Sequence, residues 1–204
     1  MTPDVATALA QARSSARALE RPVSEWLPAG LHEACLLQCR VIEQFGDIGA
    51  WKVSAIDDRQ RRAMGLAQPI GAPVPARWTL ESPARVGEAE FIQPLLECEF
   101  AFELGADLPS RDEPYTRAEV EAAIAALRIA IEVCDSRLPP ASPILAQLAD
   151  GFNNGALVVG PRHADWRSVD YASHGITLRF DGGQGPRVIA TGNGAPILGG
   201  DPVA

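Results

Sequence analysis

The chain has 204 residues, of which 47% are apolar, and a formal net charge of −8 at pH 7. This length and apolar content predict one substantial folded domain, alone or with a small appendage, and exclude wholesale disorder. The acidic balance argues against a nucleic-acid partner, which needs a basic stripe, and the short apolar runs argue against a membrane partner. The N-terminus lacks a basic start followed by an apolar block, so we expect no secretory signal and a cytoplasmic protein.

The beginning of the chain predicts a small helical region. Residues 4–20 are rich in Ala, Leu and Arg and predict one helix, and apolar residues at helical spacing over 31–45 predict a second, which Gly46 closes. From Trp51 onward short β-like runs replace this pattern. We therefore expect a helical region over residues 1–49 and a strand-rich domain over residues 50–204.

The middle of the chain combines strands with one helix. Residues 51–56 predict a strand, whereas residues 68–77, with three prolines and a glycine, predict a loop. The clearest strand is predicted over 95–104, where apolar residues alternate strictly with mostly acidic ones.

A capping box then marks a helix. Thr116 and Glu119 predict a helix that runs to about Leu127. Three further strands are predicted over residues 128–133, 156–160 and 176–180. These elements indicate a mixed α+β fold.

Two kinds of residue stand out by composition. Lys52 is the single lysine among 18 Lys and Arg residues, and lysine, unlike arginine, can lose its proton. Either Lys52 has a chemical role or it has been kept by chance. The cysteines are spaced neither as metal ligands nor as a disulfide framework, so we expect core thiols at all four positions, Cys35, Cys39, Cys98 and Cys134.

Acidic residues on apolar strands indicate a metal site. Glu97 and Glu99 project from one face of a strand, with Cα atoms roughly 6.5 Å apart. A solvated acidic edge would explain this pair, but a hard divalent cation such as Mg²⁺ or Mn²⁺ would explain it as well. Glu132 adds a third carboxylate in an apolar run, where solvation explains it less easily.

Several segments together resemble a known family. They are Trp51-Lys52-Val53, Gly65-Leu66-Ala67-Gln68-Pro69, PLLECEFAFELGADLP, AIEVCDSR and LADGFNNGALVVG. Their order and spacing resemble the 2-keto-4-pentenoate hydratase family of the fumarylacetoacetate hydrolase superfamily, which includes 4-oxalocrotonate decarboxylases. The resemblance extends from about Leu31 to the end of the chain. It implies a β-roll or barrel-like catalytic domain of the fumarylacetoacetate hydrolase type.

The resemblance also implies a site and an activity. Mg²⁺ or Mn²⁺ would lie on Glu97, Glu99 and Glu132, while Lys52 and Asp150 match active-site positions of the family. The implied activity is a metal-dependent hydratase, a lyase that adds water to a 2-hydroxy-2,4-dienoate or 2-oxo-4-enoate from aromatic catabolism. The resemblance further implies a small 2-oxo acid as substrate and a homo-oligomer.

Departures from the family leave alternatives open. Ala67, Ile70 and Gly151 replace polar residues of the relatives, which puts proton transfer and water positioning in doubt. A 4-oxalocrotonate-type decarboxylase, or a 2-oxo acid binding subunit without activity, is compatible with this loss. An acylpyruvate C–C hydrolase would need a His–Glu base, for which His32 and Glu33 form the single adjacent pair. Relatives also continue beyond the last residues of this sequence, so we expect the strand-rich domain to lack its final strands.

Overall fold

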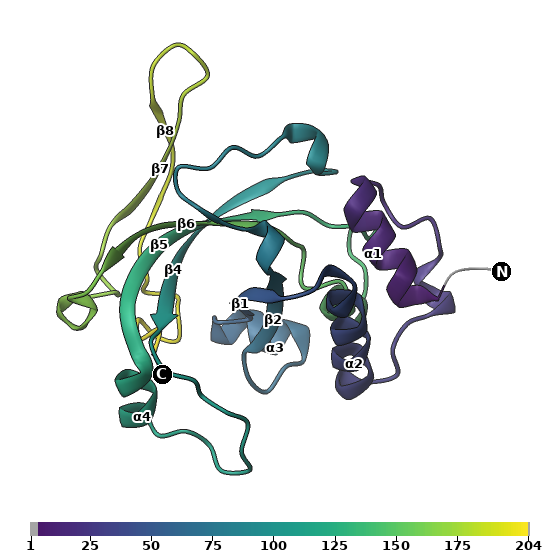
Figure 1. Cartoon of the computed structure of the whole chain (residues 1–204), viewed down its shortest axis with the longest axis horizontal. Helices are drawn as coiled ribbons and strands as arrows, with labels where there is room; N and C mark the ends of the chain where they lie inside the picture. Colours follow the sequence, from purple (N-terminus) through teal and green to yellow (C-terminus); the bar gives the residue numbers. More distant parts are fainter. Residues whose placement is uncertain (1–3, 204) are drawn as a thin grey trace. The chain divides into compact units, whose positions relative to one another are not determined.

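The structure is a computed structural model that describes residues 4–203, so the ends of the two predicted regions, residues 1–3 and 204, lie outside it. The α-helices are α1 (Val5–Ser15), α2 (Leu31–Ile42), α3 (Asp58–Met64), α4 (Arg117–Ala123) and α5 (Ile144–Ala149) (Figure 1). The strands are β1 (Ile48–Ser54), β2 (Ile70–Pro75), β3 (Thr79–Glu81), β4 (Leu95–Leu104), β5 (Ile124–Cys134), β6 (Asn154–His163), β7 (Ile176–Phe180) and β8 (Arg187–Gly192). In this part of the chain no helix combines the length and apolar character that crossing a membrane requires.

The chain divides into two compact units. The first comprises residues 1–54, 68–97 and 131–159, and the second comprises residues 55–67, 98–130 and 160–204. The four-stranded sheet has the strand order β3-β6-β5-β4, and the first unit holds β3 together with one end of each of the other three strands. The predicted boundary between residues 49 and 50 stays a prediction.

Three helices build the core of the first unit. Helix α2 packs against both α1 and α5, and the buried side chains between them include Leu9, Val41 and Ala146. Helix α1 ends earlier than predicted, because Ala16 adopts a left-handed conformation with φ of 49°. The predicted end of the second helix is confirmed: α2 passes into a short 3₁₀ turn and Gly46, with φ of 83°, terminates it.

The prediction of a loop over residues 68–77 is wrong. Residues 70–75 form β2, which pairs antiparallel with β1 in a two-stranded sheet. Pro73 and Pro75 lie two residues apart, so the positions without an N–H group fall on the same side of the strand. A strand with one unpaired side tolerates proline there, which is why the prolines do not prevent pairing.

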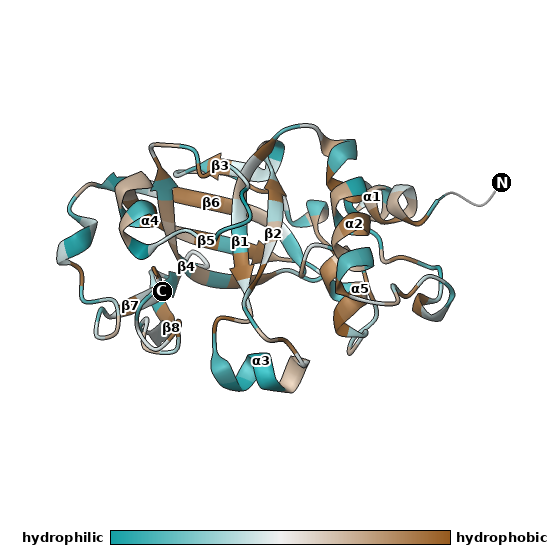
Figure 2. Ribbon diagram, turned by 90° about the horizontal axis from the view of Figure 1, so that it is seen from below, coloured by the Kyte–Doolittle hydropathy of each residue, from teal (hydrophilic) through white to brown (hydrophobic). Residues whose placement is uncertain are grey.

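The predicted strand over residues 95–104 is confirmed as β4, and its neighbour β5 is longer than predicted. The capping box of Thr116 and Glu119 is present, but α4 ends at Ala123. Ile124 is already extended, with φ of −75° and ψ of 121°. The apolar residues from Ile124 onward show no helical periodicity, and they form β5 in place of a longer helix. Much of β5 and β6 is hydrophobic (Figure 2).

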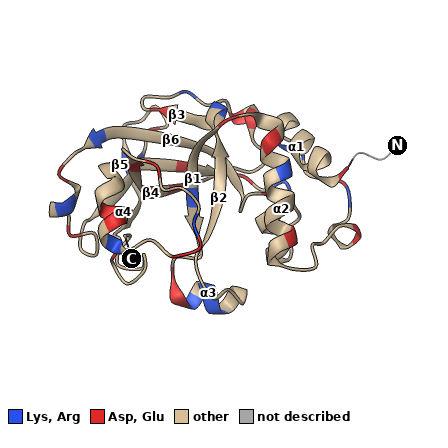
Figure 3. Ribbon diagram, turned by 60° about the horizontal axis from the view of Figure 1, so that its bottom comes forward, with Lys and Arg blue, Asp and Glu red and all other residues tan. Residues whose placement is uncertain are grey.

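The second unit has a separate core and a β-hairpin. Strands β7 and β8 pair antiparallel, and Ile124, Leu127, Trp166 and Tyr171 form a buried cluster. The helix α3 mixes acidic and basic residues on its surface (Figure 3). The sequence did not predict α3 or β8 as separate elements.

Candidate metal centre

Neighbouring strands of the first unit bring acidic and thiol groups together. Glu132 and Cys134 lie two residues apart on β5, so the pleat directs both side chains to one face of the strand. Glu97 comes from β4, the strand beside β5 in the sheet. One ligand atom of each residue lies within 4.8 Å of the ligand atoms of the other two. Glu97 is exposed while Glu132 and Cys134 are buried, so the cluster reaches from the interior to the surface.

Glu132 is a buried carboxylate with two donors on one oxygen. Its exposed fraction is 2%, and Oε1 accepts hydrogen bonds from Lys52 Nζ at 2.9 Å and from Asn154 Nδ2 at 3.2 Å. Burying a carboxylate is costly unless charge and hydrogen bonds compensate, and both kinds of compensation are present here. Because both hydrogen bonds from described residues go to Oε1, the other oxygen, Oε2, is the one that could face a cation.

Lys52, the single lysine of the chain, lies beside Glu132. Its side chain comes from β1, is 12% exposed, and pairs with Glu132. The ammonium also donates to the carbonyl oxygen of Phe152 at 2.9 Å. An ammonium has three N–H donors, so one remains beyond these two acceptors. Lys52 therefore lies beside the acidic cluster with one N–H group available to a further acceptor. Its catalytic role stays a prediction.

An unusual turn supplies the second acceptor of Lys52. Gly151, Phe152 and Asn153 all have positive φ, at 74°, 50° and 61°. Glycine and asparagine adopt this conformation readily, but a phenylalanine does so at a cost of about 1–3 kcal/mol. The turn joins α5 to β6, and its geometry both presents the Phe152 carbonyl to Lys52 and leads into Asn154.

The next residue, Gly155, has a steric reason to be glycine. A Cβ atom there would lie 2.5 Å from the carbonyl oxygen of Val133, which no side chain can accept without movement of the backbone. This close approach of β6 to β5 places Asn154 within hydrogen-bonding distance of Glu132.

The cysteines only partly follow the expectation of core thiols. Cys134 is buried, Cys35 and Cys98 are half-buried, and Cys39 is exposed, so the expectation is wrong for Cys39. That residue lies on α2, whose buried face is formed by other positions. Burial, reinforced by the charge of Glu132, raises the pKa of the Cys134 thiol. The thiol next to the carboxylates is therefore neutral at physiological pH.

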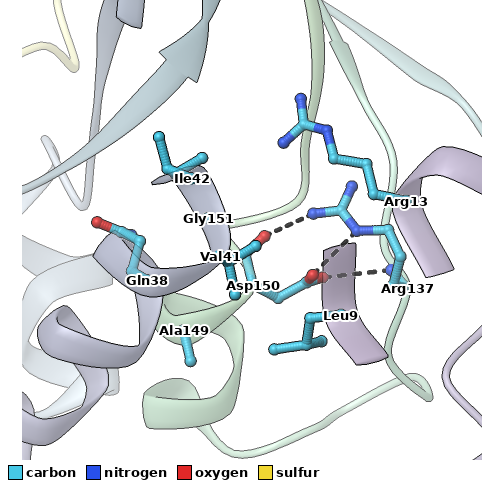
Figure 4. Close-up of a pocket in the computed structure, with 9 residues that line it drawn as sticks. All are labelled: Leu9, Arg13, Gln38, Val41, Ile42, Arg137, Ala149, Asp150 and Gly151. Carbon is cyan, nitrogen blue, oxygen red and sulfur yellow. Dashed lines mark hydrogen bonds and ion pairs between the residues drawn. The ribbon is translucent and has the colours of Figure 1, made fainter. Parts of the chain in front are cut away.

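Asp150 lies in a buried ion pair. Its Oδ1 accepts from Arg137 Nε at 3.0 Å, and the two side chains are 2% and 1% exposed. Figure 4 shows this pair beside Arg13, which reaches the same region from α1. Burial raises the pKa of the Asp150 carboxyl, and the charge of Arg137 opposes that shift. The structure thus gives Asp150 a stabilising partner, while its predicted catalytic role stays a prediction.

Replacement of Asp150 separates these two roles. Asp150→Asn leaves the Arg137 cation buried without its anion, and we expect a loss of about 3–5 kcal/mol in the free energy of unfolding. Urea denaturation measures this loss, with Asp4→Asn, which breaks an exposed pair with Arg40, as a control that should cost at most about 1 kcal/mol. A stable Asp150→Asn variant that has lost all activity would instead support the catalytic role.

Glu99 lies two residues beyond Glu97 on β4 and is half-buried. It belongs to the second unit, whereas Glu97 and Glu132 belong to the first. The alternation of β4 directs Glu97 and Glu99 to the same side of that strand. A place for Glu99 among the ligands stays a prediction.

Other polar residues that support the site were missed by the sequence analysis. Asp135 accepts from the backbone N–H groups of Ile92 and Gln93 and so fixes the segment that leads into β4. Arg137 donates to the carbonyl oxygens of Asp150 and Asn154 at 2.5 and 2.8 Å and so fixes the turn before β6. A charged residue directly after an apolar strand, as in the run CDSR, is the signal that could have indicated both.

The donor set fits a hard divalent cation. The cluster offers carboxylate oxygens from Glu97 and Glu132, which are ligands that Mg²⁺ and Mn²⁺ prefer. Oε2 of the buried Glu132 is not occupied by either of that residue's donors, Lys52 and Asn154. A cation held by this set would polarise an oxygen-rich ligand close to the ammonium of Lys52.

No known protein family profile matches the chain, and none of the curated proteins matches it. Among solved structures, 4-oxalocrotonate decarboxylase from Pseudomonas putida G7 complexed with magnesium and adipate matches with a TM-score of 0.82 at 22% identity, over 97% of this chain and 74% of that one. The decarboxylase complexed with calcium and acetate matches with a TM-score of 0.80 at 22% identity, over 100% of this chain and 78% of that one. The chain therefore has a mixed α+β fold of the fumarylacetoacetate hydrolase type, as predicted.

Proposed function

We propose that this chain is a divalent-metal-dependent enzyme that acts on a small 2-oxo acid or its dienol. The observation that carries the proposal is the pairing of buried Glu132 with Lys52 at 2.9 Å, within a cluster that also contains Glu97. Glu97, Glu99 and Glu132 would hold Mg²⁺ or Mn²⁺. The solved structures of similar fold support this choice, because they are complexes with magnesium and with calcium.

Glu132 and Lys52 would have different roles in such a reaction. A bound divalent cation supplies a Lewis acid for the charge that develops on a 2-oxo group. Glu132 holds the Lys52 ammonium in place through Oε1. Lys52 keeps one N–H beyond its two acceptors, Glu132 and the Phe152 carbonyl, and this proton can pass to the carbon skeleton of the substrate.

The first candidate reaction is hydration of a 2-hydroxy-2,4-dienoate from aromatic catabolism. Its support is the resemblance carried by Lys52, the E-x-E strand and the run AIEVCDSR. In this reaction Lys52 would protonate the end of the diene as water adds to the neighbouring carbon, and the proton that the water loses would return to Lys52.

The second candidate reaction is decarboxylation of a substrate like 4-oxalocrotonate. Its support is the fold shared with the decarboxylase of Pseudomonas putida G7. Decarboxylation needs no positioned water, so it also agrees with the loss of polar groups at Ala67, Ile70 and Gly151. Ile70, at the start of β2, and Gly151, in the turn before β6, have no polar side-chain atom and so supply no side-chain donor. The third alternative, an acylpyruvate hydrolase, is less well supported, because Glu33 is engaged by the backbone N–H of Ala29 at 2.7 Å.

Assays with two substrates distinguish these reactions. We expect Mg²⁺ to be required and EDTA to abolish turnover, with recovery on addition of Mg²⁺ or Mn²⁺. Loss of the ultraviolet band of 2-hydroxypenta-2,4-dienoate identifies the hydratase, and release of carbon dioxide from 4-oxalocrotonate identifies the decarboxylase. Metal and substrate binding without turnover of either compound would contradict the enzymatic proposal and favour a binding subunit.

We also propose a cytoplasmic homo-oligomer. Trp51 and Val53 are 62% and 55% exposed on the side of β1 opposite Lys52. Exposed aromatic and aliphatic side chains of this kind are typical of subunit contacts. Analytical ultracentrifugation that shows a monomer at micromolar concentration would contradict this proposal.

A further inference from the structure

A buried arginine on the first helix reaches the candidate metal centre. Arg13, near the end of α1, is 8% exposed, and its guanidinium lies 4.1 Å from the ring centroid of Trp78. Burial and the charge of Arg137 lower the pKa of Arg13 to about 9. Among described side chains its Nε has no hydrogen-bond partner. Burial of a cation costs free energy unless hydrogen bonds or charges compensate for it. The hydrogen bonds that Arg13 makes therefore indicate why it is buried here.

One nitrogen of Arg13 makes its hydrogen bonds to described residues. Nη2 of Arg13 donates to Oδ1 of Asn154 at 2.8 Å and to the carbonyl oxygen of Gly155 at 2.7 Å. Asn154 is fully buried, with an exposed fraction of 0%. A guanidinium has donors and no acceptor, so the Asn154 amide must turn its oxygen toward Arg13. The amide nitrogen is then left facing Glu132, where it donates to Oε1.

We propose that Arg13 is a positioning residue of the metal centre: it fixes the orientation of the Asn154 amide, and the amide in turn holds Glu132. This inference rests on the proposed metal-dependent function. Without Arg13 the Asn154 amide can rotate and direct its oxygen toward the Glu132 carboxylate, which repels it. Glu132 would then lose one of the two donors that keep Oε1 occupied and Oε2 available to a cation. Substitution of a residue that hydrogen-bonds to a metal ligand typically lowers metal affinity by about 10- to 100-fold.

A packing role is the alternative explanation for Arg13. Its guanidinium covers Trp78 and lies 5.6 Å from the ring centroid of Phe45, so a substitution could act through the apolar contacts alone. Arg77 provides a matched control, because its guanidinium also lies over Trp78, at 4.6 Å, and Arg77 itself is exposed. Only Arg13 of the two donates to Asn154 in the described chain.

The test measures Mn²⁺ affinity of the whole chain by electron paramagnetic resonance, without substrate. We expect Arg13→Met to weaken Mn²⁺ binding about tenfold or more and Arg77→Met to leave it within about twofold. Arg13→Lys should recover most of the affinity, because a single ammonium nitrogen can serve both acceptors that Nη2 now serves. Loss of affinity in Arg13→Lys equal to that in Arg13→Met would contradict the proposed donor role.

A double-mutant cycle shows whether Arg13 acts through Asn154. Asn154→Leu keeps the branched shape of the side chain and removes the amide, so it should weaken Mn²⁺ binding by itself. In that background we expect Arg13→Met to change the affinity by less than about twofold. Full additivity of the two substitutions would overturn the inference, because Arg13 would then act by another route.

The inference and the proposed function fail in different ways. A wild-type chain that does not bind Mn²⁺ overturns both, whereas wild-type binding that Arg13→Met leaves unchanged overturns the inference alone. If Arg13→Met does not fold, the wild-type chain still gives a test by nuclear magnetic resonance. The side-chain amide signal of Asn154 should shift when Mg²⁺ is added, and an unchanged signal under saturating Mg²⁺ would overturn the inference.

Discussion

Glu132→Gln is expected to lower the Mg²⁺ affinity of the chain by roughly 100-fold or more, which corresponds to about 2.8 kcal/mol. Glutamine has nearly the shape of glutamate, and its oxygen can still accept from Lys52 and Asn154 where Oε1 now does. The amide nitrogen would then take the place of Oε2, the oxygen that could face the cation. The substitution therefore removes a negatively charged ligand while it preserves the surrounding hydrogen bonds.

Isothermal titration with Mg²⁺ measures the loss of affinity for Glu132→Gln, and the two-substrate assay should show no turnover. Glu88→Gln changes the charge equally at an exposed position of the same unit and should bind Mg²⁺ like the wild type. Mg²⁺ binding and turnover by Glu132→Gln at wild-type levels would show that the cation lies elsewhere. Glu99→Gln belongs in the same series, because it tests whether the carboxylate of the second unit is a ligand.

Replacement of Lys52 should abolish turnover. Lys52→Met removes the charge and the transferable proton, whereas Lys52→Arg keeps the charge and withholds the proton. If Lys52 transfers a proton, we expect both variants to lose about 10²- to 10⁴-fold in kcat. Lys52→Arg can still donate to Oε1 of Glu132, so its Mg²⁺ affinity should change by less than about threefold. If Lys52 only anchors the substrate carboxylate, Lys52→Arg should keep much of the rate and Lys52→Met should mainly raise KM.

The measurement for Lys52 is the steady-state assay on whichever substrate the wild type consumes, combined with Mg²⁺ titration. Arg85→Met removes one positive charge from an exposed position of the same unit and should leave kcat and KM unchanged. Wild-type kcat and KM in Lys52→Met would end both roles for this residue.

The parts of the site that could be predicted are those with a local signal. Glu97 and Glu132 interrupt apolar strand patterns, where an acidic residue needs a reason, and Lys52 is the single lysine of the chain. Strand alternation also predicts which side chains share a face, which is why β4 was predicted with its observed bounds. What local patterns cannot give is the neighbour of each face.

The supporting residues lacked such a signal. Asn154 stands in the turn-rich run DGFNNG, where a turn role explains it, and its partner Arg13 is 141 residues away in the sequence. Arg13 lies on an Ala-rich helix and resembles a surface residue. The same limit explains the error over residues 68–77, because proline content cannot show that one side of β2 stays unpaired in its sheet.

The acceptor that Phe152 provides to Lys52 belongs to the main chain, and every amino acid carries that carbonyl group. The codon at position 152 can therefore change without loss of this acceptor, provided that the new residue fits the volume of the buried ring and tolerates φ near 50°. Gly, Asn and Asp meet the second condition, whereas Val, Ile and Thr do not. Related chains are thus expected to preserve the backbone path here while the amino acid varies, so a search for invariant side chains would overlook this contact.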